Sequence, residues 1–175
     1  MNADQFFQQA HEIVSNCALC FVSSNDASGQ INSRVVEILE IGQDLTICFM
    51  TDSRTRKALE ICRGSAISLS FLSMADRGYV TLGTVPVVSA DTALKQRIWK
   101  EPLLTWFPDG PDDPYLIAVT CKPVWVEMWS RIRGIAPAPL GLNSVRLIRR
   151  DGNWHVNHTF PAMRDSLREG SYDGQ

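Results

Sequence analysis

The segment from Leu45 to Cys62, which reads LTICFMTDSRTRKALEIC, carries the strongest local signal in this chain. Its first part, Leu45 to Met50, is apolar and β-rich, which predicts a buried strand. Hydroxyl and basic side chains follow from Thr51 to Lys57, and Ala58 to Cys62 predicts a short helix that ends at Gly64. Because a helix start offers N–H groups and positive potential, this turn is suited to a phosphate. The alternative is a capped helix whose cations are solvated.

Upstream of this segment, the sequence predicts one helix and two strands. The helix runs from Asp4, which can cap it, to about Asn16, with apolar residues at helical spacing. The runs from Ala18 to Ser24 and from Ile31 to Ile41 are β-rich and are separated by turn residues. Together with the strand that begins at Leu45, they predict a meander of three strands.

Downstream, apolar runs and turn residues predict an antiparallel strand pair, a helix, a shaped loop, two more strands and a closing hairpin. Their ranges are Ala66 to Ser73, Gly78 to Ser89, Asp91 to about Pro102, Trp106 to Pro114, Tyr115 to Cys121, Val124 to Ser130, and Ser144 to Arg150 with Trp154 to Asn157. About eight strands and two or three helices predict an α+β protein with a mostly antiparallel sheet. Closure into a small barrel would protect the sheet edges.

The length of 175 residues and the 45% hydrophobic content predict one folded domain. We expect a single domain over residues 1–163 and a polar tail over residues 164–175. A net charge of −2 disfavours nucleic-acid binding. No membrane-spanning run and no secretory signal are apparent, so we expect a cytoplasmic protein with no membrane partner. The five cysteines lie mostly in apolar runs, which predicts buried, reduced thiols.

Arg34 is a candidate site residue because strand alternation places it on the same face as Val36 and Ile38. A charge on a core-type face needs a partner. That partner could be an anionic ligand, or a carboxylate such as Glu37, Glu40 or another acidic residue.

Alternation also places Trp125 and Trp129 on one strand face, with Glu127 between them. This group could form the rim of the protein or part of a site. The pair Cys17 and Cys20 lacks a second cysteine pair at ligand spacing, so we expect no metal site.

Several of these segments, in their order and spacing, resemble the pyridoxamine 5′-phosphate oxidase-like superfamily of FMN-binding split barrels. The matching segments are Ser33-Arg34-Val35-Val36, Leu45 to Phe49, Thr51, Ser53 to Lys57, the helix to Cys62, and Tyr79-Val80-Thr81-Leu82-Gly83. The loop from Trp106 to Pro114 and the run Val126-Glu127-Met128-Trp129 look most like its general-stress-protein branch. The resemblance covers roughly residues 5 to 160.

The resemblance implies a mostly antiparallel, six-stranded split β-barrel with flanking helices, and a homodimer with two FMN sites between the subunits. It assigns the phosphate to Arg34, Arg56 and Lys57, and the flavin to the backbone near Arg34 and Met50. Trp129 matches a residue that closes over the cofactor from the partner subunit. The residues that we expect to bind FMN are Arg34, Val35, Val36, Glu37, Met50, Thr51, Ser53, Arg56, Lys57 and Trp129.

The function implied is that of an FMN-binding flavoprotein, an oxidoreductase that acts on a small-molecule redox substrate. Pyridoxamine phosphate is not the expected substrate, because Pro139 to Ser144 replaces the family's Arg-x-His element. The chain also has Leu39-Glu40 where a lysine is usual, and Gly78 where a glutamine is usual.

Two further readings of the resemblance stay open. One is a non-catalytic protein that binds flavin, deazaflavin or haem, with His11, His155 and His158 as the only histidines available to haem. The other is a barrel that has lost its ligand and survives as an interaction dimer.

Overall fold

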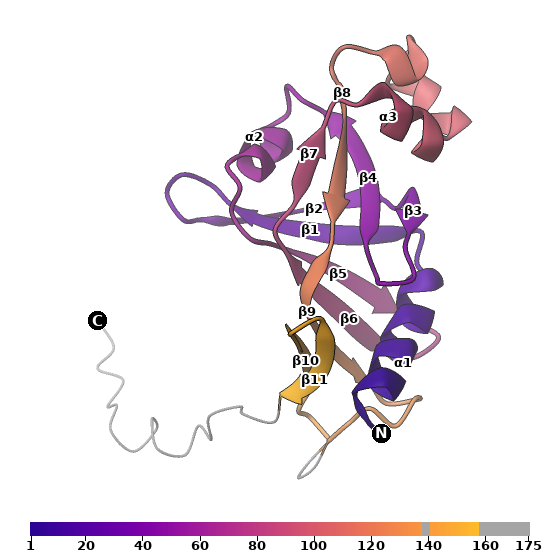
Figure 1. The fold of residues 1–175 in the computed structure, drawn as a ribbon, viewed down its shortest axis with the longest axis vertical. Coiled ribbons are helices and arrows are strands. Elements are labelled where there is room, and N and C mark those ends of the chain that lie inside the picture. Colours follow the sequence, from indigo (N-terminus) through magenta and orange to yellow (C-terminus); the bar gives the residue numbers. More distant parts are fainter. Residues whose placement is uncertain (138–140, 158–175) are drawn as a thin grey trace.

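The computed structural model describes residues 1–137 and 141–157, and Figure 1 shows their arrangement. The helices in these ranges are α1 (Ala3–Ser15), α2 (Arg56–Cys62) and α3 (Thr92–Ile98), with short 3-10 turns η1 (Glu101–Thr105) and η2 (Gly110–Asp112). The strands are β1 (Leu19–Asn25), β2 (Ile31–Glu37), β3 (Glu40–Ile41), β4 (Ile47–Asp52), β5 (Ile67–Ser73), β6 (Gly78–Thr84), β7 (Val87–Ser89), β8 (Leu116–Cys121), β9 (Pro123–Ser130), β10 (Val145–Arg150) and β11 (Asn153–Asn157). The expected tail at 164–175, the domain end at 163 and His158 lie outside the described residues.

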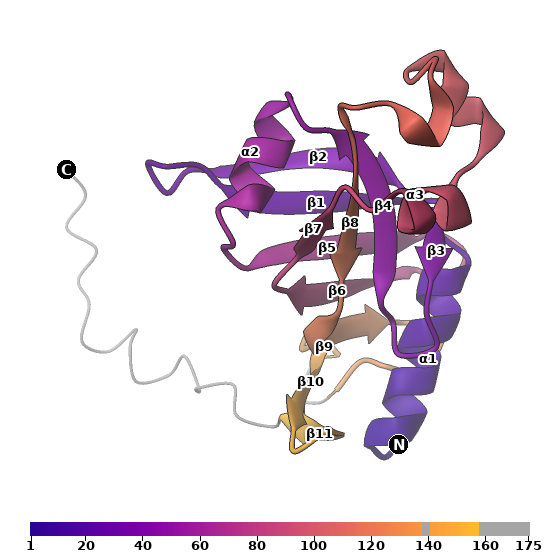
Figure 2. The same cartoon turned by 45° about the horizontal axis from the view of Figure 1, so that its top comes forward.

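Two antiparallel sheets build the fold. The larger has the order β11-β10-β9-β6-β5-β1-β2, and the smaller has the order β3-β4-β8-β7. Figure 2 shows the smaller sheet crossing the larger one, with α1 beside both. The prediction of an α+β, mostly antiparallel protein is confirmed. The two sheets of the described residues hold eleven strands rather than the six of the family resemblance. Two of the long strands predicted from the sequence are each divided between the sheets.

The expected strand from Ile31 to Ile41 breaks at Ile38 and Leu39. The Ile38 amide donates to the Ala18 carbonyl beside β1, whereas the Leu39 amide donates to Cys48 in β4. The chain therefore passes from the larger sheet to the smaller sheet at this step. The predicted three-strand meander was wrong for this reason: β2 pairs with β1, but β3 pairs with β4 in the other sheet.

The predicted strand from Gly78 to Ser89 is divided in the same way. β6 ends at Thr84 and β7 begins at Val87, with Pro86 between them. Proline lacks an N–H group for a sheet ladder, which is consistent with a break here. β5 and β6 pair antiparallel along their whole length, as predicted.

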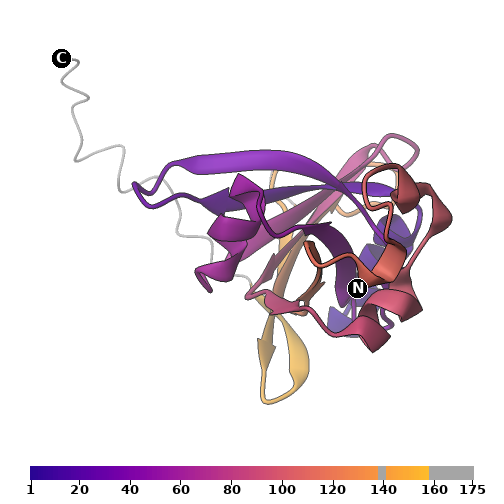
Figure 3. The same cartoon turned by 90° about the horizontal axis from the view of Figure 1, so that it is seen from above.

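One large hydrophobic core fills the space between the two sheets and α1. It includes Val22, Val36, Phe49, Leu69, Phe71, Leu82, Met128 and Ile13. A smaller core joins the outer side of β4 to the segment that contains α3 and η1, through Met50, Ile98, Leu103 and Phe107. Figure 3 shows α2 lying beside β1 and β2, while the β10–β11 hairpin projects from another side. No helix in the described ranges is long and apolar enough to cross a membrane.

Local capping explains where the helices begin. Asn2, not Asp4, caps α1: its side chain accepts from the Gln5 amide and Gln5 bonds back to the Asn2 amide. The prediction that Asp4 is the cap was wrong, because Asp4 lies within the first turn. Asp91 caps α3 as predicted.

The side of the larger sheet that faces away from the core is called the outer face here. It carries Leu19, Phe21, Val35, Glu37, Leu72, Tyr79, Trp125, Glu127 and Trp129. Phe21, Val35 and Leu72 are each about half exposed or more, at 49%, 48% and 63%. A row of exposed apolar side chains on a sheet face is typical of an interaction surface.

Candidate functional site

Arg34 lies in β2 on the side that faces the core, as alternation predicted, and its side chain is only 17% exposed. Its Nη1 donates to the Ser24 hydroxyl at 2.6 Å and to the Asn32 carbonyl at 3.0 Å, with the Val22 carbonyl at 3.2 Å. Its Nη2 donates to the carboxylate of Glu60, with which it forms an ion pair. Within the described ranges, Nε donates to no acceptor.

Glu60 is the carboxylate that the sequence analysis left unidentified. Its side chain is 2% exposed, and it lies on α2 facing β1 and β2. It accepts from the Ser24 hydroxyl at 2.6 Å and from the Asn32 amide at 3.1 Å. The Ser24 hydrogen bond and the Arg34 charge hold the pKa of Glu60 below its usual value.

Neither Glu37 nor Glu40 pairs with Arg34, although both were candidate partners in the sequence. Glu37 is on the outer face and lies 3.8 Å from the Lys100 ammonium. Glu40 pairs with Arg97 of α3.

Lys57 is the cation of this cluster that has no partner among the described residues. Its side chain is half-buried, and it makes no hydrogen bond or ion pair with any residue in 1–137 or 141–157. Burial, followed by the nearby charge of Arg34, lowers the pKa of Lys57. An ammonium that is partly desolvated beside another cation is stabilised by a bound anion. The Ser53 hydroxyl, half-buried in the same turn, likewise has no partner among the described residues.

The other polar side chains of this turn are already engaged. Arg54 pairs with Asp52 at 2.6 Å and stacks over the Tyr115 ring at 3.7 Å. Thr55 caps α2 through its hydroxyl, which accepts from the Ala58 amide. Because α2 has only seven residues and its start is capped, the side chains carry the positive character of this site rather than the helix end.

Arg56 differs from its neighbour Lys57. Its side chain is 70% exposed, and its Nε lies 3.5 Å from Glu60. Arg34 and Arg56 therefore share a single carboxylate, Glu60, and Lys57 lies near Arg34. Three cations against one anion leave a net positive site, and the free Nε of Arg34 and the Lys57 ammonium supply donors. These residues fit the phosphate end of FMN.

The remaining expected site residues lie on either side of this cluster. In β2, Val36 packs into the core, whereas Val35 and Glu37 point to the outer face. In β4, Thr51 and Met50 are buried, and Met50 packs into the smaller core. Only the backbone of Met50 is therefore left to line a ligand.

Trp129 does not join the cluster within one chain. It lies on β9, and β6, β5 and β1 separate β9 from β2 in the sheet. Its indole donates to the Gly141 carbonyl at 2.7 Å. Trp125 and Glu127 share its face, as alternation predicted, and Glu127 accepts from the Tyr79 hydroxyl at 3.2 Å.

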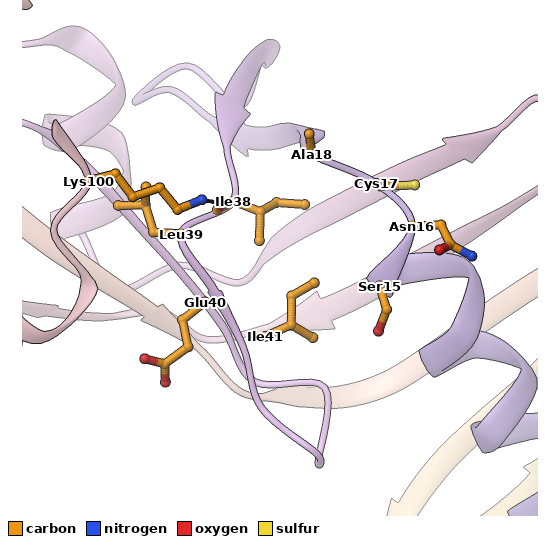
Figure 4. A pocket seen from close by; sticks show the side chains of 9 residues that line it. All are labelled: Ser15, Asn16, Cys17, Ala18, Ile38, Leu39, Glu40, Ile41 and Lys100. Carbon is orange, nitrogen blue, oxygen red and sulfur yellow. Dashed lines mark hydrogen bonds between the residues drawn. The ribbon is translucent and has the colours of Figure 1, made fainter. Parts of the chain in front are cut away.

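A cavity of about 390 Å³ opens where β2 ends (Figure 4). Ile38, Leu39 and Glu40 form one wall, and Ser15 and Asn16 at the end of α1 form the opposite wall. The Lys100 ammonium reaches the rim and donates to the Ile38 carbonyl at 3.0 Å. The volume is in the range of small-molecule sites.

Metal binding and histidine or cysteine chemistry have less support in the structure. In residues 1–137 and 141–157, no three acidic, histidine or cysteine side chains are grouped to hold a metal ion. His11 is bonded through Nδ1 to Ser15, and His155 is exposed. All five cysteines are free; Cys20, Cys48 and Cys121 are buried as predicted, whereas Cys17 is half-buried and Cys62, the last residue of α2, is exposed.

Sequence reasoning missed Glu60 and Lys100. Glu60 follows Arg56 by one helical turn, and this spacing was a signal that a carboxylate faces the cations. Lys100 carried no comparable signal, because it meets Ile38 only through the packing of the α3 segment on β2 and β4.

Comparisons with known proteins give the family. Residues 5–137 match the family described as pyridoxamine 5′-phosphate oxidase like. No curated protein matches this sequence.

Solved structures share the fold at low sequence identity. A Clostridium acetobutylicum protein related to general stress protein 26, of the pyridoxinephosphate oxidase family, has a TM-score of 0.69 at 18% identity, covering 83% of this chain and 95% of that one. A pyridoxamine 5′-phosphate oxidase-related, FMN-binding protein from Nostoc punctiforme has a TM-score of 0.67 at 15% identity, covering 91% and 95%.

A third structure is PhzG from Burkholderia lata 383 in complex with tetrahydrophenazine-1-carboxylic acid, with a TM-score of 0.63 at 16% identity, covering 90% of both chains. At these identities the structures establish the fold, and the family match covers more than half of the sequence. This chain therefore belongs to the pyridoxamine 5′-phosphate oxidase-like family.

Proposed function

We propose that this protein binds FMN and holds the phosphate of the cofactor between Arg34 and Lys57. The observation that carries the proposal is the half-buried Lys57 ammonium, which has no partner in the described chain and lies near Arg34. A phosphate dianion would supply the missing countercharge and accept from Arg34 Nε and Lys57 Nζ. The Ser53 hydroxyl is a third available donor.

We assign the rest of FMN to the backbone of β2 from Arg34 to Glu37 and to the Met50-Thr51 step of β4. A bound flavin supplies the redox chemistry, and the protein supplies binding, orientation and electrostatics. The cavity at Ile38 begins where this β2 stretch ends, which makes it the site we propose for a small-molecule redox substrate. The structural neighbour PhzG was solved in complex with tetrahydrophenazine-1-carboxylic acid, which supports a small organic substrate.

The protein is proposed to act as a homodimer through the outer face, which would bring Trp129 of one subunit toward the cofactor site of the other. The exposed Phe21, Val35 and Leu72 support this assembly. Replacing Phe21 by Glu should give a monomer in size-exclusion chromatography with light scattering. Val87→Glu is the matched control, because Val87 is 64% exposed but lies in the other sheet. A dimer that survives Phe21→Glu would contradict the use of the outer face. The single domain ending at 163 and the cytoplasmic location stay predictions.

Cofactor binding is tested by two titrations, one with FMN and one with riboflavin, and flavin fluorescence is the measured signal in both. FMN should bind at least about tenfold more tightly, because only FMN carries the phosphate that a charged pair can bind. Equal affinities for the two flavins, or no binding of either, would overturn the proposal.

Redox function is tested separately on the FMN-loaded protein. Adding reduced pyridine nucleotide should bleach the flavin absorbance band near 450 nm. If FMN binds but no donor reduces it, the protein is a flavin carrier rather than an oxidoreductase.

A further inference from the structure

Glu60 is a buried carboxylate within the cation cluster that we assign to the FMN phosphate. Its carboxylate contacts Arg34, lies 3.5 Å from Arg56 Nε, and is held by Ser24 at 2.6 Å. These contacts come from β1, β2 and α2, so the carboxylate is fixed at the junction of three elements. At 2% exposure, its charge is screened by water less than that of an exposed carboxylate.

Glu60 contacts one side of the Arg34 guanidinium and leaves the Nε side available to another acceptor. Ser24 bonds Nη1 and Glu60 bonds Nη2, so the edge formed by the two terminal nitrogens is filled. The Nε side has no acceptor within the described ranges. A phosphate on that side would therefore share the guanidinium with Glu60 and would lie close to its negative charge.

We propose that Glu60 is an internal counter-ion that shares Arg34 with the FMN phosphate and thereby weakens the binding of the cofactor. The inference rests on the proposed function, and it concerns how tightly the same site holds FMN. Without ligand, Glu60 keeps the largely buried Arg34 paired, which stabilises the empty site. With ligand, the two anions lie on different sides of one guanidinium and repel each other, so the cofactor is held less tightly.

Two opposing effects decide what the loss of the carboxylate does. Glu60→Gln removes the repulsion between Glu60 and the phosphate, which favours binding. It also removes a contact that orients Arg34, which disfavours binding. Because Ser24, Val22 and Asn32 still hold Nη1, the orientation of Arg34 persists and the electrostatic effect dominates.

The test compares the wild type with Glu60→Gln in FMN and riboflavin titrations. FMN should bind Glu60→Gln about tenfold more tightly than the wild type, and riboflavin should bind both equally. A purely structural role for Glu60 predicts equal or weaker FMN binding. Unchanged or weaker FMN binding by a folded Glu60→Gln would therefore overturn the proposal.

Asp52→Asn is the matched control. Asp52 is a carboxylate in the same turn, but it pairs with the exposed Arg54 and does not contact Arg34. Its loss should change FMN affinity less than twofold, because an exposed pair is screened by solvent. An equal gain of FMN affinity in Asp52→Asn would mean that the loss of any nearby negative charge has this effect. That result would refute a specific role of Glu60.

Thermal unfolding in inorganic phosphate gives an independent readout. The anion should raise the Tm of Glu60→Gln more than that of the wild type, because it replaces the missing partner of Arg34. If Glu60→Gln is unfolded without ligand, phosphate should restore its far-UV circular dichroism spectrum; no restoration would overturn the proposal.

The two proposals fail differently. If the wild type does not prefer FMN over riboflavin, the proposed function fails in the natural protein. The counter-ion role is then decided by whether Glu60→Gln gains that preference: a gain supports it, and no gain refutes it.

Discussion

Arg34 and Arg133 are both largely buried arginines that join distant parts of the chain, but their surroundings differ in charge. Arg133 donates to Asp76 at 2.7 Å and to Glu12 at 2.5 Å, and also bonds Gln9. It therefore ties α1 to the β5–β6 turn with two carboxylates for one cation. Arg34 shares one carboxylate, Glu60, with Arg56, while Lys57 nearby pairs with no carboxylate of residues 1–137 or 141–157.

This difference in charge balance distinguishes an ion-pair cluster that stabilises the fold from one that can bind a ligand. Where carboxylates match or exceed the cations, the group is satisfied by the protein itself and needs no ligand. Where cations exceed carboxylates and one ammonium is half-buried, an external anion improves the electrostatics. The cluster around Arg34 is of the second kind, and the following experiments test whether the distinction holds.

The largest expected effect comes from replacing each arginine by methionine. Arg34→Met and Arg133→Met should each lower the free energy of unfolding by about 2 kcal/mol, since a buried carboxylate loses its partner. Only Arg34→Met should also weaken FMN binding, by about a hundredfold. Urea unfolding and fluorescence titration measure the two quantities. An equal loss of FMN affinity in Arg133→Met would remove the distinction.

Lys57→Met should weaken FMN binding by about tenfold and leave riboflavin binding unchanged. It should not lower the free energy of unfolding, because Lys57 has no partner to lose in the described chain. Lys122→Met is the control, since Lys122 is paired with Asp44 at 3.1 Å away from the cluster. Destabilisation by Lys57→Met would show that this ammonium has a structural role.

Acid should weaken both clusters in the same direction. The Ser24 and Arg34 contacts lower the pKa of Glu60, and the Ser73 and Arg133 contacts lower the pKa of Asp76. A carboxyl whose pKa is lower in the folded state stabilises the fold above its unfolded pKa, roughly 4. That contribution is lost as the pH falls through the folded pKa. Urea unfolding between pH 7 and pH 3 should show a smaller decline for Glu60→Gln and for Asp76→Asn than for the wild type.

The smallest effect is expected for Arg56→Gln. Its guanidinium is 70% exposed, so solvent screens its charge and FMN affinity should fall less than about threefold. The same titration measures it. A loss as large as that of Lys57→Met would mean that Arg56 turns toward the phosphate when FMN binds.

Local periodicity predicted which way many side chains point. Alternation placed Arg34 with Val36 on the core side of β2, and it placed Trp125, Glu127 and Trp129 together on one face of β9. It did so because neighbouring residues of a strand point to opposite faces whatever the rest of the chain does. The same reasoning could not locate the break at Ile38 and Leu39. Whether a strand stays in one sheet depends on which partners its backbone meets.

The sequence by itself determined the family, the α+β class, the position of most elements and the cationic turn from Ser53 to Lys57. Only the tertiary structure decided that Glu60 pairs with Arg34, that Lys57 has no partner in the described chain, and that three strands separate the strand of Trp129 from the strand of Arg34. The reason is the sequence separation of the residues involved. Strand and helix patterns arise from residues that lie within a few positions of each other. Charge balance in a buried site depends on side chains that meet only when β1, β2 and α2 pack together.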